Sequence, residues 1–239
     1  MTVSSTDRRG FLKKAIVAGT GFAIAGTAMV DSIAAEKKKE VEANEDLMRE
    51  HGVLRRALLV YGAAAQRLRT NPSTVPADAL LKTARLFRTF GEDYHERQLE
   101  EKFIFPVVRK LKGPAAAYPD VLQAQHDQGR KLTEYVIKVT GSGTISGSNA
   151  APLAKALDAF NLMYANHAAR EDTIVFTAWK DALPSKRYRE MSEQFEKIEK
   201  RMFSGDGFED AVRQIGEIET QLGLANISQF TIGDPPSSS

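Results

Sequence analysis

The residues best suited to chemistry in this chain are its histidines, of which it has four in 239 residues, with no cysteine. They are spread along the chain as His51, His95, His126 and His167. Glu171 follows His167 by four residues, so on a helix the two side chains share one face. Imidazole and carboxylate groups together suit iron, manganese or zinc. The lack of cysteine excludes disulfides, thiolate zinc sites and thiol catalysis.

The histidines fall in stretches whose apolar residues recur every three or four positions, the pattern of a buried helix face. The stripe around His51, for example, contains Leu47 and Leu54. A carboxylate such as Glu171 is expensive to bury in such a stripe unless it is paired or bound to a metal. The sequence therefore predicts that four imidazoles, one from each of four helices, meet around a metal site.

The second of these helices has an irregular pattern after His95. The next inward carboxylate, Glu100, is five residues away, which in a regular α-helix places it about 140° from His95 around the axis. A π-bulge within Glu96–Leu99 would restore the register, and such bulges are frequent at functional sites. We therefore expect a bulge there and Glu100 as the inward carboxylate. Without the bulge, Glu101 or Glu96 would take its place.

Six helices are expected to position these groups, because helical patterns alternate with turn residues and no strand-like alternation persists after residue 36. The expected ranges are 40–69, 76–113, 118–141 and 149–183 for four long helices, and 185–203 and 207–222 for two shorter ones. Four long helices with short connections predict an all-α fold, an antiparallel up-down-up-down four-helix bundle. The expected division is a bundle over 40–182, a C-terminal helical hairpin packed on it over 185–224, and a flexible tail over 225–239.

Four motifs surround the histidines in order along the chain. They are Arg49-Glu50-His51-Gly52-Val53-Leu54, Tyr94-His95-Glu96-Arg97-Gln98-Leu99-Glu100-Glu101 with Phe105-Pro106, Gln125-His126-Asp127, and His167-Ala168-Ala169-Arg170-Glu171-Asp172. Over about residues 44–180 the chain resembles hemerythrin-like HHE cation-binding proteins. The resemblance implies a di-iron centre held by these histidines and by one glutamate each from the second and fourth helices. The implied metal ligands are His51, His95, Glu100, His126, His167 and Glu171.

The chain departs from the family pattern in two places. The spacing from His95 to Glu100 is one residue longer than usual, and the third helix offers one histidine where oxygen-carrying hemerythrins use more. The set therefore looks more like the di-iron members linked to sensing, or to repair after nitrosative and oxidative damage. The resemblance implies two iron ions, with an oxo or hydroxo bridge between them as one form. Ligand type alone leaves zinc and manganese open.

We expect an exported protein whose metal centre binds or senses dioxygen, nitric oxide or another small oxidant, because no flavin, haem or thiol relay is visible to supply electrons. The alternatives are a di-iron enzyme that reduces peroxide or nitric oxide, and an iron storage or carrier protein. Beyond residue 35, acidic and basic residues are equal in number, so we expect no nucleic-acid partner.

The first 35 residues predict an export signal. The segment Asp7-Arg8-Arg9-Gly10-Phe11-Leu12-Lys13-Lys14 resembles the twin-arginine signal. The apolar stretch Ala15–Val30 that follows is too short and too rich in small residues for a spanning helix. Ser32-Ile33-Ala34-Ala35 offers a cleavage site. We expect a periplasmic or otherwise exported protein that is recognised by the twin-arginine machinery and is anchored to the membrane only if the signal is not cleaved.

Other polar and aromatic residues lie next to the implied ligands. We expect the acidic neighbours to be solvated or to hydrogen-bond to the ligands; they are Glu50, Glu96, Glu101 and Asp172. The tyrosines near the site are expected to be core aromatics rather than redox or hydrogen-bonding partners; they are Tyr61, Tyr94 and Tyr164. Trp179 is expected to pack at the end of the bundle.

Overall fold

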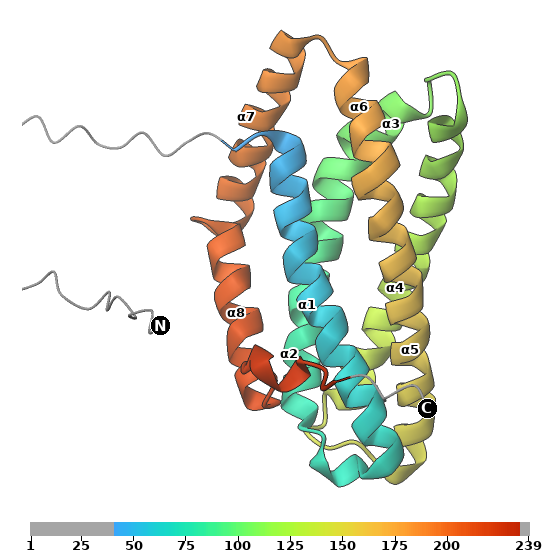
Figure 1. Ribbon diagram of the computed structural model, residues 1–239, viewed down its shortest axis with the longest axis vertical. Helices are drawn as coiled ribbons and strands as arrows, with labels where there is room; N and C mark the ends of the chain where they lie inside the picture. The colour runs from blue at the N-terminus through green and yellow to red at the C-terminus, as the bar shows by residue number, and fades with distance from the viewer. Residues whose placement is uncertain (1–40, 235–239) are drawn as a thin grey trace, which may run out of the picture. The chain divides into compact units, whose positions relative to one another are not determined.

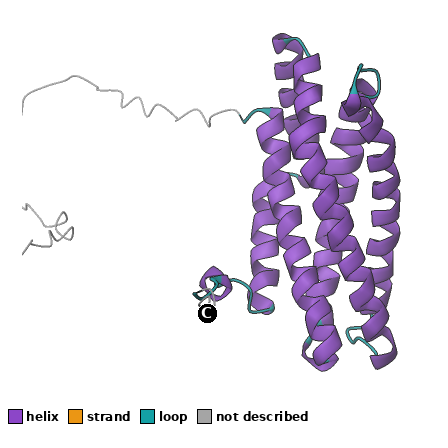
Figure 2. Ribbon diagram, turned by 45° about the vertical axis from the view of Figure 1, so that its right-hand side comes forward, coloured by secondary structure: helices purple, strands orange, loops and turns teal. Residues whose placement is uncertain are grey.

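A computed structural model describes residues 41–234, so the expected export signal lies outside the described part. Within 41–234 every regular element is helical (Figures 1 and 2), which confirms the all-α helical bundle. The first long helix is α1 (Ala43–Thr70) and the third is α4 (Tyr118–Thr140). The second consists of α2 (Ala77–Leu86), η2 (Phe87–Ile104) and α3 (Phe105–Val108), and the fourth of α5 (Gly147–Arg170), η4 (Glu171–Val175) and α6 (Phe176–Ala182). None of these helices is long and apolar enough to cross a membrane.

The helix boundaries follow the turn residues of the sequence. Pro76 immediately precedes α2, and Pro119 lies in the first turn of α4, where a missing N–H costs nothing. The second long helix ends at Val108, five residues before its predicted end at Gly113. Gly113 has a φ of +105°, which is incompatible with a right-handed helix. Short 3₁₀ turns, η1 (Pro72–Thr74) and η3 (Pro114–Ala117), occupy the connections on either side of this helix.

The second long helix is wound more widely than an α-helix over η2, with π-type geometry for 18 residues. The predicted π-type winding within Glu96–Leu99 is therefore present, but it extends over a much longer segment than predicted. In a π-type winding a step of five residues returns to the same face. His95 and Glu100 are accordingly both buried, with 1% and 0% exposure. A second wide turn, η4, was not predicted, and it begins at Glu171.

An aromatic layer fills the bundle next to the histidines. The ring of Phe87 packs edge-on against Phe160 and Tyr164, with centroids 4.8 Å apart in each case, and Tyr61 packs edge-on against Phe160. Gly129 lies in the middle of α4, where glycine is unfavourable. A Cβ at this position would lie 2.1 Å from the Tyr164 hydroxyl, so the ring needs the space that glycine leaves.

The last two helices, α7 (Ser185–Phe203) and α8 (Gly207–Gln221), cover one side of the bundle. Helix α7 contacts α1 and η2, whereas α8 contacts α1 and α2 (Figure 1). Trp179 is fully buried between α6 and α7, where it stacks on Phe195 with centroids 5.7 Å apart, as expected for the bundle end. Arg56 binds Glu219 through two hydrogen bonds of 2.8 and 2.5 Å and ties α8 to α1. The expected flexible tail contains a 3₁₀ turn, η5 (Ile227–Phe230).

Candidate metal centre

The structure brings the four imidazoles together in the bundle interior as two pairs. In the first pair, the Nε2 atoms of His51 on α1 and His95 on η2 are 3.0 Å apart. In the second pair, the Nε2 atoms of His126 on α4 and His167 on α5 are 3.1 Å apart. None of the four residues is more than 3% exposed. Each long helix therefore contributes one buried imidazole, as the sequence pattern predicted.

Two carboxylates connect the pairs. One oxygen of Glu100 lies 3.3 Å from Nε2 of His95, and its other oxygen lies 3.3 Å from Nε2 of His126. The Oε2 atom of Glu171 lies 3.0 Å from Nε2 of His167 and 3.5 Å from Nε2 of His51. Both glutamates are fully buried. All six residues selected from the sequence thus surround one volume, and each carboxylate reaches across both imidazole pairs.

Each imidazole presents its other nitrogen, Nδ1, to an acceptor oxygen outside the cluster. These contacts are His51 to Asp172 at 2.7 Å, His95 to Glu50 at 2.5 Å, His126 to Glu101 at 3.0 Å and His167 to Gln125 at 2.9 Å. Because these oxygens only accept, Nδ1 carries the proton in each ring. The Nε2 atom of every neutral ring then has a free lone pair that faces the cluster, which is how metal-binding imidazoles are oriented.

The cluster needs positive charge at its centre. The carboxylate oxygens of Glu100 and Glu171 are buried and have no hydrogen-bond partner, although imidazole nitrogens lie 3.0–3.5 Å away. Two lone pairs 3.0 Å apart also repel each other unless a proton or a cation lies between them. Divalent cations would satisfy both requirements, so the donor set fits a metal centre.

The pKa directions show the same need for positive charge. Burial acts to lower the pKa of His95 and of His126, but nearby carboxylates, foremost Glu100 for His95 and Glu96 for His126, outweigh it and hold both pKa values well above the ordinary value. Burial, reinforced by the charge of His126, lowers the pKa of His167 to about 3. Burial, reinforced by the charge of Glu100, raises the pKa of Glu171 well above its ordinary value. Positive charge on His95 and His126 is therefore favoured in the metal-free chain, so protons and metal would compete for the same lone pairs.

Three carboxylates around the cluster are paired with arginines. Asp172 forms an ion pair with Arg55, and Glu101 forms one with Arg130. Arg130 also contacts Glu96 at 3.0 Å. Glu96 and Glu101, the alternatives to Glu100, therefore both bind the guanidinium of Arg130 and lie on the side of His126 that carries Nδ1. Arg130 supplies their positive charge, so they do not need a metal ion between them.

Of the two alternatives for the acidic neighbours, hydrogen bonding to the proposed ligands is confirmed for Glu50, Glu101 and Asp172. Glu50 and Glu96 are not solvated, since they are 1% and 2% exposed and both accept hydrogen bonds from buried phenols. The expectation that the nearby tyrosines only fill the core is wrong for two of them, because Tyr94 donates to Glu50 and Tyr164 donates to Glu96. Sequence reasoning also assigned no role to Arg130 or Gln125. A clue for Gln125 was its place beside His126 in the third motif.

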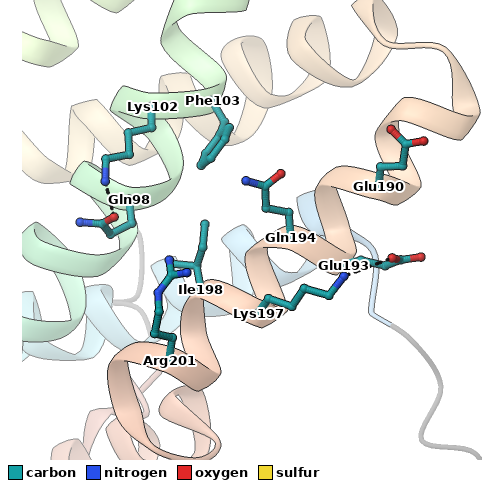
Figure 3. A pocket seen from close by; sticks show the side chains of 9 residues that line it. All are labelled: Gln98, Lys102, Phe103, Glu190, Glu193, Gln194, Lys197, Ile198 and Arg201. Carbon is teal, nitrogen blue, oxygen red and sulfur yellow. Dashed lines mark hydrogen bonds and ion pairs between the residues drawn. The ribbon is translucent and has the colours of Figure 1, made fainter.

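Aromatic rings enclose the cluster. Phe105 stacks on His126 with centroids 5.4 Å apart and planes 20° apart, and Phe176 lies 5.4 Å from His51. A surface groove lies between η2 and α7 (Figure 3), but none of the six clustered residues lines it. In the groove, Lys102 hydrogen-bonds to Gln98 and Lys197 lies 3.7 Å from Glu193.

Comparisons with known proteins agree with the site. The family model described as the hemerythrin HHE cation binding domain matches residues 42–179. Two uncharacterised proteins, one from Mycobacterium bovis and one from Mycobacterium tuberculosis, are each 41% identical to this chain over 197 residues, which are 82% of this chain and 76% of theirs. No solved structure gives a significant match. The chain therefore belongs to the hemerythrin HHE cation-binding domain family, and its buried cluster of histidines and glutamates fits a metal site.

Proposed function

We propose that this protein holds two iron ions and binds or senses a small oxidant, such as dioxygen or nitric oxide, at them. The observation that carries the proposal is the arrangement of two imidazole pairs spanned by two carboxylates. The proposed ligands are His51, His95, Glu100, His126, His167 and Glu171. The imidazoles form two separate pairs and each carboxylate spans both, so the arrangement suits two cations better than one.

The choice of iron rests on the family and on the ligand types. Six protein ligands underfill two octahedral shells, so open positions would remain for a small molecule. Iron bound there would supply redox-active, Lewis-acidic positions at which an oxidant can coordinate. Phe105 and Phe176 pack against His126 and His51 and are themselves fully buried, and none of the six proposed ligands is more than 3% exposed. We therefore expect the molecule that binds there to be small.

The export route is a further part of the proposal. The twin-arginine machinery carries proteins that are already folded, often with metal bound, which would suit a chain that must assemble a buried centre before it leaves the cytoplasm. Cell fractionation should place the full chain outside the cytoplasm. Replacing Arg8 and Arg9 by lysine should retain it inside. Export of the doubly replaced chain would contradict this part.

The central experiment is metal analysis of protein purified without oxygen, followed by optical spectra on adding dioxygen or nitric oxide. We expect two iron ions per chain and a spectral change with one of these gases. A matched control is Glu134→Gln, because this glutamate has a side chain that is 68% exposed and lies outside the cluster. Iron that a mild chelator removes, together with no response to oxidants, would contradict the proposal and indicate storage.

A second candidate function, reduction of hydrogen peroxide, is favoured by a specific observation. Turnover requires electrons, and the chain has no cysteine to supply them. Two buried phenols, Tyr94 and Tyr164, nevertheless lie within hydrogen-bonded reach of the cluster. Repeated consumption of peroxide with an added reductant, in proportion to bound iron, would support this candidate.

A further inference from the structure

Tyr94 is connected to the imidazole cluster through one carboxylate. Its hydroxyl donates a hydrogen bond of 2.8 Å to Oε1 of Glu50, and Oε2 of Glu50 accepts a hydrogen bond of 2.5 Å from Nδ1 of His95. The phenol, the carboxylate and the imidazole are all buried, with at most 1% exposure. An unbroken line of hydrogen bonds therefore runs from the phenol to a proposed iron ligand.

Tyr164 lies beside the second imidazole pair and also donates to a buried carboxylate, Glu96, which in addition contacts Arg130 at 3.0 Å. Its hydroxyl donates a hydrogen bond of 2.7 Å to Oε1 of Glu96, and its ring centroid lies 5.4 Å from that of His167. The residue is 4% exposed, and Gly129 leaves room for its hydroxyl. Each imidazole pair thus has one buried phenol beside it, and each phenol donates to a buried carboxylate.

The partners of Glu50 distinguish it from the other outer carboxylates. Asp172 and Glu101 each bind an arginine. Within residues 41–234, Glu50 has hydrogen bonds to Tyr94 and His95 but no ion pair with a lysine or arginine. Glu50 therefore connects the Tyr94 hydroxyl to His95 alone, and no arginine enters this line of hydrogen bonds.

We propose that Tyr94 and Tyr164 are one-electron donors to the metal centre when it meets hydrogen peroxide; the proposal rests on the iron centre proposed above. In the overall step each phenol loses one electron and its O–H proton and becomes a neutral phenoxyl radical. One peroxide takes up the two electrons and two protons, its O–O bond breaks, and two waters leave. The two phenols supply both electrons, so a bound metal would pass them on without a net change of its own oxidation state.

The test uses the full chain loaded with iron, mixed with hydrogen peroxide without other reductant and frozen within milliseconds to seconds for electron paramagnetic resonance. We expect a tyrosyl signal in the wild type that narrows when the protein contains ring-deuterated tyrosine. Tyr94→Phe and Tyr164→Phe should each lose part of the signal, and the double variant should lose all of it. Tyr135→Phe, which changes a tyrosine of α4 outside the hydrogen-bonded network, should keep the full signal.

Iron content of every sample separates the two proposals. Full iron and consumption of peroxide with no tyrosyl signal, or a signal that survives in the double variant, would overturn the donor role and leave the iron centre standing. A wild-type chain that binds no iron would overturn both. Because phenylalanine keeps the ring, the variants should fold, and near-wild-type iron content in them would confirm that the loss of signal reflects the missing hydroxyls.

Discussion

The substitution Gly129→Ala tests how closely Tyr164 fits against α4. A Cβ at position 129 would lie 2.1 Å from the Tyr164 hydroxyl and 2.9 Å from two of its ring carbons. Helix propensity alone favours alanine over glycine by about 1 kcal/mol. Overpacking a core typically costs about 1–3 kcal/mol. We therefore expect a net loss of unfolding free energy of about 0–2 kcal/mol.

Gly52→Ala is the matched control, because Gly52 lies in the middle of α1 and a Cβ there meets no atom within 4 Å. It should gain up to about 1 kcal/mol from helix propensity. The two variants should then differ by about 1–3 kcal/mol, the overpacking cost itself. For a chain of this size each kcal/mol corresponds to about 2–4 °C in Tm.

The assay is chemical denaturation of metal-free and iron-loaded protein, followed by helix content. If Gly129→Ala proves as stabilising as Gly52→Ala, the contact with Tyr164 does not make a side chain at position 129 costly, and the reasoning is refuted. A second check is the pair of substitutions Gly129→Ala and Tyr164→Phe together. Removing the hydroxyl takes away the nearest of the three contacts, so part of the lost stability should return.

Three further predictions concern the ligands and the acidic residues near them. His167→Ala should sharply lower iron content, because it removes a ligand and leaves Glu171 buried beside a cavity; full occupancy by metal analysis would contradict the assignment. Glu100→Ala should lose more iron than Glu101→Ala, because only Glu100 faces the Nε2 atoms; equal iron content would contradict the role of the wide winding. Burial, with the charges of nearby glutamates, raises the pKa of Asp46 from 3.8 to about 7, so the folded chain binds more protons than the unfolded chain between these values. Stability from this group should therefore be highest below about pH 4 and fall as pH rises towards 7, and Asp46→Asn should flatten that slope in denaturation curves; an unchanged slope would count against it.

The sequence predicted the buried faces well, because a repeat of three to four residues determines which side of a helix points inward. It also located Glu100, since an insertion of one residue between His95 and the next inward carboxylate can be read directly from the spacing. The length of η2 could not be predicted. One bulge and a long wide winding leave the same apolar pattern, and interhelical packing decides between them.

The sequence named three of the four Nδ1 partners as candidates for hydrogen bonds to the ligands, but it could not say which imidazole each of them would meet. Successive residues on a helix differ in direction by about 100°, so small rotations of a helix decide which polar residue meets which imidazole. Glu50 reaches His95 on another helix, and Asp172 reaches His51 across 121 positions in sequence. Such pairings depend on the assembled bundle and have no local signature.

The wide winding of η2 also has a consequence for how relatives are recognised. An added residue in a regular α-helix would rotate all later side chains away from the interior. In η2 the wider π-type winding accommodates the extra residue, so the side chains before and after it still point into the bundle. A one-residue insertion in this helix can therefore be tolerated without loss of the buried cluster of histidines and glutamates. A search that fixes the number of residues between the second histidine and its glutamate would pass over such chains, so that gap should be allowed to vary by one.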